Sequence, residues 1–187
     1  MDLSALKKWA AESRLTLATA VAEGIRIHVD RLHSLGIDFY GYAIDPGEPY
    51  DIRRLVAVTN READIKVPVH HPQHAYYRYC VDEWANWEHG EFQEANAMLG
   101  RLNEQLATRL ANIEQGSGTD RLKAAYATGL LDAVLGGFRT AVANYAFGDA
   151  DPFLAIWISD SDHPIMAESV GWLNSEDVAE EFMAEFG

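Results

Sequence analysis

The stretch DPFLAIWIS, residues 151–159, decides the fold of this chain. Six apolar residues in a row follow its proline and end at a serine, which is the length and composition of a β-strand. Because the residues on both faces of this strand are apolar, both faces must be covered, and we expect the strand to lie in the centre of a sheet. It comes late in the chain and therefore has to return to a sheet that is formed earlier.

Two earlier stretches supply that sheet. Residues 37–44 (IDFYGYAI) and 53–60 (RRLVAVTN) are short and rich in aromatic and branched residues, and the turn DPGEPY between them predicts an antiparallel pair. Residues 75–80 (AYYRYC) are a candidate for a third strand. Residues 81–92 (VDEWANWEHGEF) are expected to begin a helical stretch.

Three long segments have the apolar periodicity of helices. They cover residues 3–34, 92–113 and 119–142, and the break QGSGTD, residues 115–120, lies before the last of them. Short helices are expected to close the chain. The sequence therefore predicts an α+β fold, in which a small, mostly antiparallel sheet of about four strands is covered by three long helices and several short ones. Since the late strand joins a sheet made earlier, residues 1–187 are expected to form a single domain.

The charge and cysteine content exclude several classes of function. Acidic residues outnumber basic ones 29 to 15, and the formal net charge is −14. This charge disfavours nucleic acid and anionic membrane and favours a basic protein partner, although solubility alone would be an equally good reason for it. The one cysteine, Cys80, excludes an internal disulfide, and its apolar surroundings favour a core role over a nucleophilic one. With no signal-peptide pattern and no long apolar run, we expect a cytoplasmic protein.

The segment SDSDHP, residues 159–164, places two carboxylates and an imidazole directly after the decisive strand. Asp160, Asp162 and His163 are candidate metal ligands, as in a metal-assisted hydrolase. The pattern of a calcium loop is absent, and Asp151 would lie about 30 Å away at the other end of an extended strand. We therefore favour a structural role, in which Asp162 caps the next helix and Asp160 lies near its positive end, and we predict no metal there.

Histidines and aromatic residues suggest two further sites. His70, His71 and His74 have a zinc-like spacing, but Pro72 interrupts the helix that it would need, so a surface loop is favoured. The following segment mixes aromatic and acidic residues, which is typical of interface cores and also of a helix packed on a sheet. The residues predicted to bind a partner are Asp82, Glu83, Trp84, Trp87, Glu88, Asp160 and Asp162, with a core role for Trp84 as the alternative.

The order of FYGYAI, AVTNREA, YYRYCVDEW, ISDSD and ESVGWLN along the chain resembles a bacterial family catalogued as domain of unknown function 4303. YxxDEW and SVxxLN are the more specific pieces. The resemblance implies a small single-domain α+β protein without an established activity, so it supplies no catalytic residues. Some similar small acidic families are immunity proteins, which neutralise toxins exchanged between bacteria.

These observations favour a non-enzymatic protein-binding module, with an immunity-type inhibitor of a toxin as its specific form. Such a protein would occlude a basic cleft with an acidic face. No Walker loop, dinucleotide fingerprint, zinc ribbon or GxSxG motif occurs, so no cofactor is expected. The alternatives are the metal-assisted hydrolase that uses Asp160, Asp162 and His163, and a scaffold that oligomerises through an exposed helix stripe.

Overall fold

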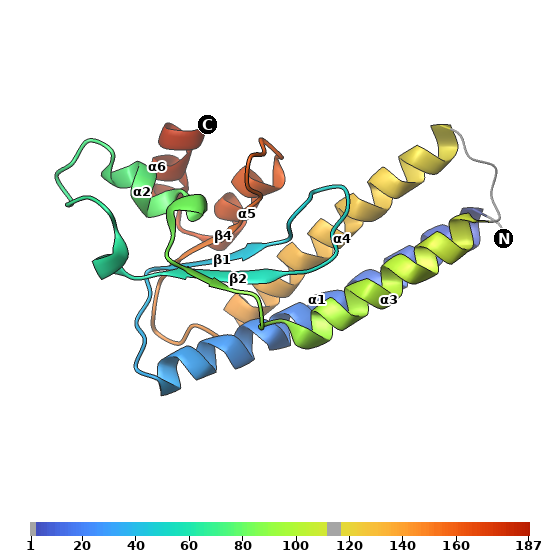
Figure 1. Cartoon of the computed structure of the whole chain (residues 1–187), viewed down its shortest axis with the longest axis horizontal. Helices are drawn as coiled ribbons and strands as arrows, with labels where there is room; N and C mark the ends of the chain where they lie inside the picture. The colour runs from blue at the N-terminus through green and yellow to red at the C-terminus, as the bar shows by residue number, and fades with distance from the viewer. Residues whose placement is uncertain (1–2, 112–116) are drawn as a thin grey trace.

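The computed structural model describes residues 3–111 and 117–187, whose elements are shown in Figure 1. The helices are α1 (Leu3–Ser34), α2 (His74–Tyr79), α3 (Gln93–Leu110), α4 (Ser117–Ala143), α5 (Ile165–Leu173) and α6 (Glu176–Phe186), with the 3-10 turns η1 (Glu62–Asp64) and η2 (Val81–Glu83). The strands are β1 (Gly41–Asp45), β2 (Val56–Asn60), β3 (Asn86–Glu88) and β4 (Phe153–Ile156). Ile113 and the first two residues of the predicted break, Gln115 and Gly116, lie outside the described residues.

The strands form one mixed sheet in the order β3-β2-β1-β4. β1 pairs antiparallel with β2, and β2 pairs antiparallel with β3, whereas β1 and β4 run parallel. The predicted α+β fold is therefore confirmed, as is the mostly antiparallel sheet, to which one parallel pairing is added.

The prediction of a central position for the decisive strand is wrong, because β4 lies at an edge of the sheet. Its outer edge is covered by α5 instead of a fifth strand. The Asn174 side chain exchanges two hydrogen bonds with Leu154, accepting from the N–H (2.8 Å) and donating to the carbonyl (2.7 Å). The Ser169 hydroxyl accepts from the N–H of Ile156 (2.9 Å). Helix side chains thus replace a neighbouring strand, which explains how an edge strand can be apolar on both faces.

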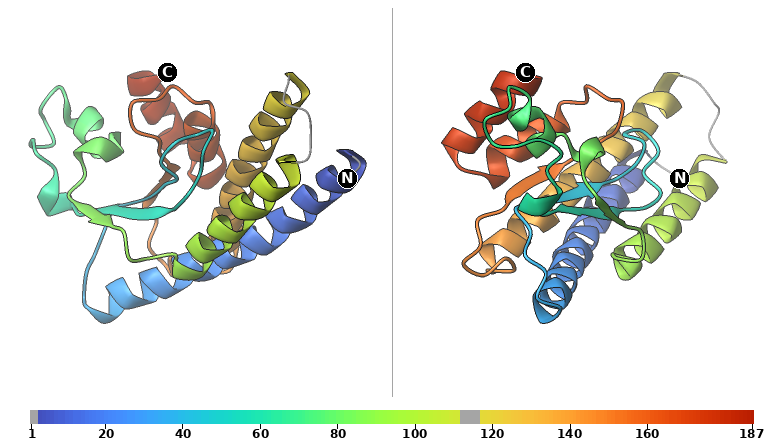
Figure 2. Two further views of the ribbon diagram at one scale, coloured as in Figure 1. Left: turned by 45° about the vertical axis from the view of Figure 1, so that its right-hand side comes forward. Right: turned by 60° about the vertical axis from the view of Figure 1, so that its left-hand side comes forward.

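Helices cover both faces of the sheet, as Figures 1 and 2 show. α1, α3 and α4 lie on one side, where side chains such as Tyr42, Ile44 and Leu154 enter what we call the α1-side core. α2, η2 and α6 lie on the other, where Val58 and Phe153 enter the α6-side core. Alternation along each strand divides the residues between the two cores.

Two predictions between residues 75 and 92 are wrong. The expected third strand at 75–80 is mostly helix α2, and the expected helix at 81–92 contains η2 and strand β3. The ring of Tyr79 packs α2 against the sheet, because it is buried against Phe153 of β4 with ring centroids 4.8 Å apart. β3 is only three residues long, and all three are half-buried, so no alternation of apolar and polar residues marked it.

Candidate functional site

The chain leaves the two parallel strands at the same edge of the sheet. β1 ends at Asp45, and the N–H of Trp157, one residue beyond β4, donates to the carbonyl of Ile44 at 3.0 Å. Ser159 and Asp160 therefore follow the end of β4 beside the end of β1. The carboxyl ends of parallel strands are a common place for ligands to bind.

Exposed carboxylates gather at this edge. The Ser159 hydroxyl donates a hydrogen bond to the carboxylate of Asp82, which lies in η2 and is 77 residues away in sequence. Asp82, Asp160 and Asp162 are all exposed. Asp160 has a φ of 53°, in the left-handed region that aspartate tolerates better than most residues, and the chain turns there from β4 toward α5. The fold thus brings Asp82 next to the segment that carries the other two predicted acids.

The carboxyl group of Asp45, at the end of β1, lies close enough to Asp82 to be affected by its charge. Burial raises the pKa of the Asp45 carboxyl, and the nearby negative charge of Asp82 raises it further. A hydrogen bond from the N–H of Gly47 (2.8 Å) and the positive charge of Arg54 act in the opposite direction without cancelling the shift. A cation brought to this edge would relieve that repulsion.

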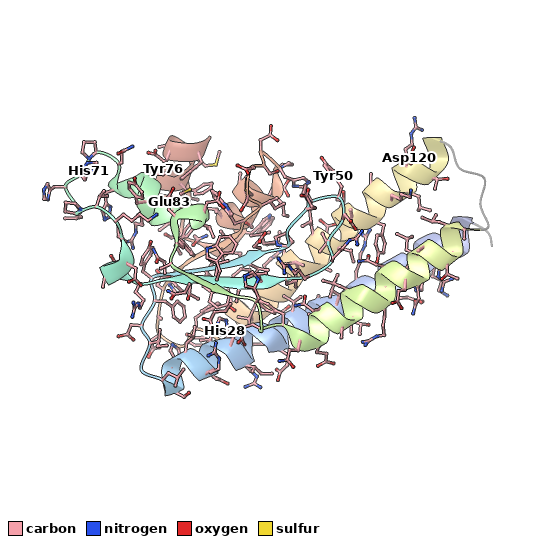
Figure 3. The ribbon with its side chains drawn as sticks, in the orientation of Figure 1. His28, Tyr50, His71, Tyr76, Glu83 and Asp120 are labelled. Carbon is pink, nitrogen blue, oxygen red and sulfur yellow. The ribbon has the colours of Figure 1, made fainter. Side chains whose placement is uncertain are left out.

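An aromatic residue borders the acids. Tyr50 lies in the connection between β1 and β2, is 72% exposed, and meets the His163 ring edge-on with centroids 6.0 Å apart (Figure 3). We call Tyr50, Asp82, Asp160, Asp162 and His163 the carboxyl-edge face. Its composition of exposed acids beside an aromatic ring suits contact with a basic protein surface.

The expected cap of α5 by Asp162 is not found. Pro164 occupies the N-cap position and makes no side-chain cap bond. Instead the N–H of His163 donates to the Ser161 hydroxyl (3.1 Å), and Nδ1 of His163 accepts from the N–H of Ile165 (3.2 Å). Ser161 and His163 satisfy the turn, so the carboxylate of Asp162 is left facing solvent.

The other residues predicted to bind a partner lie elsewhere. Glu83 is half-buried and pairs with Lys66. Trp84 is 3% exposed and belongs to the α6-side core, as its alternative interpretation expected. Trp87 packs on the same core, while Glu88, its neighbour in β3, turns to the opposite face of the sheet. The seven predicted residues therefore do not form one surface, and only Asp82, Asp160 and Asp162 share the carboxyl edge.

The histidine loop stays a surface feature. His70 is exposed, Nδ1 of His71 accepts from the N–H of Gln73 (3.2 Å), and His74 begins α2. Pro72 precedes that helix and does not interrupt it. Cys80 is buried, with its thiol pKa raised by burial, which agrees with the predicted core role.

A second polar cluster lies on the α1 side of the sheet, away from the carboxyl edge. Figure 3 shows its member His28 on the opposite side of the sheet from Glu83, which follows Asp82 in η2. His28 of α1 is fully buried, with Nδ1 3.0 Å from the Tyr42 hydroxyl and Nε2 3.2 Å from Oε1 of Glu88. Arg31, one turn further along α1, contacts both Glu88 and, at 3.1 Å, Glu91. We call these five residues the His28 cluster.

Protonation in the His28 cluster follows from its burial. Burial lowers the pKa of His28 more than the carboxylates of Glu88 and Glu91 raise it. Burial acts to raise the pKa of Glu88, but its hydrogen bonds to Arg31 and His28 outweigh this and leave the pKa lowered. Burial holds the pKa of the Tyr42 hydroxyl far above its ordinary value. The hydroxyl therefore donates to Nδ1, and neutral His28 donates from Nε2 to Glu88.

The His28 cluster is the metal-like grouping of this chain. Among the residues whose side chains the structure describes, His28, Glu88 and Glu91 are the one set of three His, Cys, Asp or Glu ligand atoms that all lie within 4.8 Å of one another. No pattern in the sequence marks this grouping, because His28 stands in an apolar helical stripe and its partners Tyr42 and Glu88 are 14 and 60 residues away.

The fold and these two clusters define an α+β protein whose mixed sheet lies between two layers of helices. The chain belongs to the family described as Domain of unknown function (DUF4303), whose model matches residues 21–175. The matched range contains both the carboxyl-edge face and the His28 cluster. No curated protein and no solved structure matches the chain. Among the described helices, none has the length and apolar character needed to cross a membrane.

Proposed function

We propose that this chain is a bacterial cytoplasmic, non-enzymatic binding protein, and that the carboxyl-edge face takes a basic protein partner. An immunity-type inhibitor of a toxin is the specific form that we favour. The observation that carries the proposal is the convergence of Asp82, Asp160 and Asp162 beside exposed Tyr50. Among the residues whose side chains the structure describes, no lysine or arginine forms an ion pair with these three acids.

The charge of the chain and the exposed Tyr50 ring both support a basic partner. A net charge of −14 attracts a basic protein from a distance, and unpaired acids at one edge give the encounter a direction. Lysine or arginine side chains of the partner would relieve the repulsion that Asp45 and Asp82 experience. Tyr50 adds a ring of the kind that anchors protein interfaces.

The proposal predicts that a gene for a basic protein lies beside this one, and that protein provides the test. Its binding is measured by surface plasmon resonance with the wild-type chain and with the triple variant Asp82→Asn, Asp160→Asn, Asp162→Asn. We expect the triple variant to bind at least about tenfold more weakly, mainly through slower association, and to show a shallower dependence on salt.

A matched control separates this face from net charge alone. Glu94→Gln, Glu104→Gln and Asp132→Asn remove the same charge from exposed positions on α3 and α4, in the opposite layer of helices. This control is expected to bind nearly as well as the wild type. Equal weakening by both triple variants would show that the protein's overall charge, and not the carboxyl edge, governs binding. A neighbouring gene for a metabolic enzyme, with no binding to its product, would count against the proposal altogether.

A further inference from the structure

We propose that His28, Glu88 and Glu91 form a binding site for a divalent first-row transition metal, with Zn²⁺ as the reference ion. The site lies on the α1 side of the sheet and is independent of the partner-binding proposal. It combines one imidazole with two carboxylates from three separate places: α1, β3 and the loop before α3. This donor set favours zinc, iron or manganese over calcium and magnesium, which bind oxygen ligands almost exclusively.

The spacing of the ligand atoms already fits a small ion. Zinc–nitrogen and zinc–oxygen bonds of about 2.0–2.2 Å place the ligand atoms of a tetrahedral site about 3.4 Å apart. Nε2 of His28 and Oε1 of Glu88 are 3.2 Å apart, and all three ligand atoms lie within 4.8 Å of one another. Small side-chain movements therefore suffice to close the three ligands around an ion.

His28 makes the kind of hydrogen bond that orients a metal-binding histidine. Its other ring nitrogen is held by the Tyr42 hydroxyl at 3.0 Å, so the ring cannot rotate freely. When a metal takes Nε2, the proton now on that nitrogen moves to Nδ1, and Nδ1–H then donates to the oxygen of Tyr42. The histidine remains neutral through this exchange, as a metal ligand must.

The charge of the cluster also calls for a cation. The carboxylates of Glu88 and Glu91 share one cation, the guanidinium of Arg31, among the ion pairs of lysine and arginine that the described residues form. The Arg31 side chain is 41% exposed and has room to swing toward solvent. We therefore regard Arg31 as the counter-ion that a metal displaces.

A hollow provides access to the cluster. It has a volume of about 320 Å³ and is lined by Gly24, Ile27, Gly90, Glu91 and Phe92, among others. Glu91 lines this hollow and belongs to the ligand set, whereas His28 and Glu88 do not line it. The hollow therefore approaches the ligand set from the side of Glu91, where a three-residue zinc site would take water as its fourth ligand.

The test uses the full chain, stripped of metal, in a His70→Ala, His71→Ala, His74→Ala background that removes the three closely spaced histidines of residues 70–74. Zn²⁺ binding is measured by calorimetry, and Co²⁺ binding by the visible absorption that marks tetrahedral coordination. We expect one equivalent of each ion to bind. Glu91→Gln and His28→Gln should each weaken binding at least about tenfold, and Tyr42→Phe by about 10- to 100-fold.

Arg31→Gln distinguishes a metal site from a purely structural ion-pair cluster. If a metal displaces Arg31, this variant binds zinc more tightly than the parent. The control Glu94→Gln alters another carboxylate that lines the hollow and should leave the affinity unchanged. Circular dichroism checks that each variant is folded. Arg31 and Glu91 are more exposed than His28, so their substitution should disturb the fold less. Absence of binding in the background that lacks His70, His71 and His74, or weaker binding by Arg31→Gln, would overturn the proposal.

Discussion

Two tryptophans of the α6-side core differ in one hydrogen bond. Nε1 of Trp84 donates to the carbonyl of Arg78 at 3.1 Å. Nε1 of Trp157 is buried and has no hydrogen-bond partner among the described residues, although its ring packs edge-on against Phe186. Both rings are more than nine-tenths buried, so they provide a comparison at the scale of single atoms.

We expect Trp84→Phe to cost more stability than Trp157→Phe. Both substitutions remove the same ring volume, but only the first removes a hydrogen bond. That loss should cost about 0.5–1.5 kcal/mol, because the Arg78 carbonyl keeps a second donor in the Tyr40 hydroxyl at 3.0 Å. The second removes a buried N–H that is already unsatisfied, which offsets part of its packing loss. Urea unfolding of both variants measures the difference. Equal losses of unfolding free energy would show that the N–H of Trp84 contributes nothing.

Most residues of the two family-like motifs make contacts that hold the fold together. The final SVxxLN piece contains Ser169 and Asn174, the two side chains that satisfy the outer edge of β4. In YxxDEW, the Tyr79 hydroxyl donates to Glu181 at 2.6 Å, Asp82 accepts from Ser159, and Trp84 fills the core. Most of this pattern therefore maintains the fold, and Asp82 is the member that also reaches the carboxyl-edge face.

At the scale of elements, α5 covers the edge of β4 where a fifth strand would otherwise lie. A substitution that removes a bond to β4 should lower the stability, whereas one on the solvent side of the helix should raise it. Asn174→Ala leaves the N–H and carbonyl of Leu154 unpaired, so we expect a loss of about 1–3 kcal/mol or more. Gly171→Ala is the control in the same helix, because a Cβ there meets nothing within 4 Å. It should stabilise the protein by about 0.5–1 kcal/mol. Thermal or urea unfolding that finds Asn174→Ala neutral would contradict this account of the edge.

The docking of α1 against β3 should depend on pH. The folded-state pKa of His28 lies below the ordinary 6.5, so the unfolded chain takes up a proton that the folded chain resists. The stabilisation is thus complete above 6.5 and is lost as the pH falls below it. The pKa of Glu88 is lowered from 4.5, which adds a further loss at more acidic pH. Unfolding free energies measured from about pH 8 to about pH 5 should fall, and His28→Gln should flatten that fall. A slope that is unchanged in the variant would assign the pH dependence to other groups.

At the scale of the whole molecule, α6 completes the second layer of helices. It lies just beyond the matched family range, which ends at residue 175. Phe182 is 3% exposed and stacks on Phe153 of β4 with centroids 5.9 Å apart. A helix at the end of the chain therefore covers a strand that joins the sheet's edge.

Truncation of Phe182 should weaken the whole fold. We expect Phe182→Ala to cost about 3–5 kcal/mol, because it opens a cavity over the sheet. Met183, the next residue on α6, is 45% exposed, so Met183→Ala should cost far less. Chemical unfolding of both variants provides the measurement. A small loss for Phe182→Ala would mean that α6 is an appendage to the core and not part of it.

The long elements and the acidic candidates were predictable, whereas the contacts between them were not. The apolar periodicity of α1, α3 and α4 marks each helix locally, and the branched residues of β1 and β2 mark a hairpin. α2 and β3 were misread because six and three residues are too few for a period to show. Asp82 and Asp160 were recognised as candidates by their chemistry, but the bond that joins their segments spans 77 residues.

By itself, the sequence determined the fold class, the long helices, the acidic charge and the burial of the six apolar residues at 153–158. These properties arise from residue type and short-range spacing. The tertiary structure alone decided that β4 lies at an edge sealed by Ser169 and Asn174, and that Glu88 turns away from Trp87 toward His28. Such features depend on which segments, distant in the sequence, pack together. A buried strand has apolar residues on both faces whether a strand or a helix covers its edge, so its sequence does not distinguish the two.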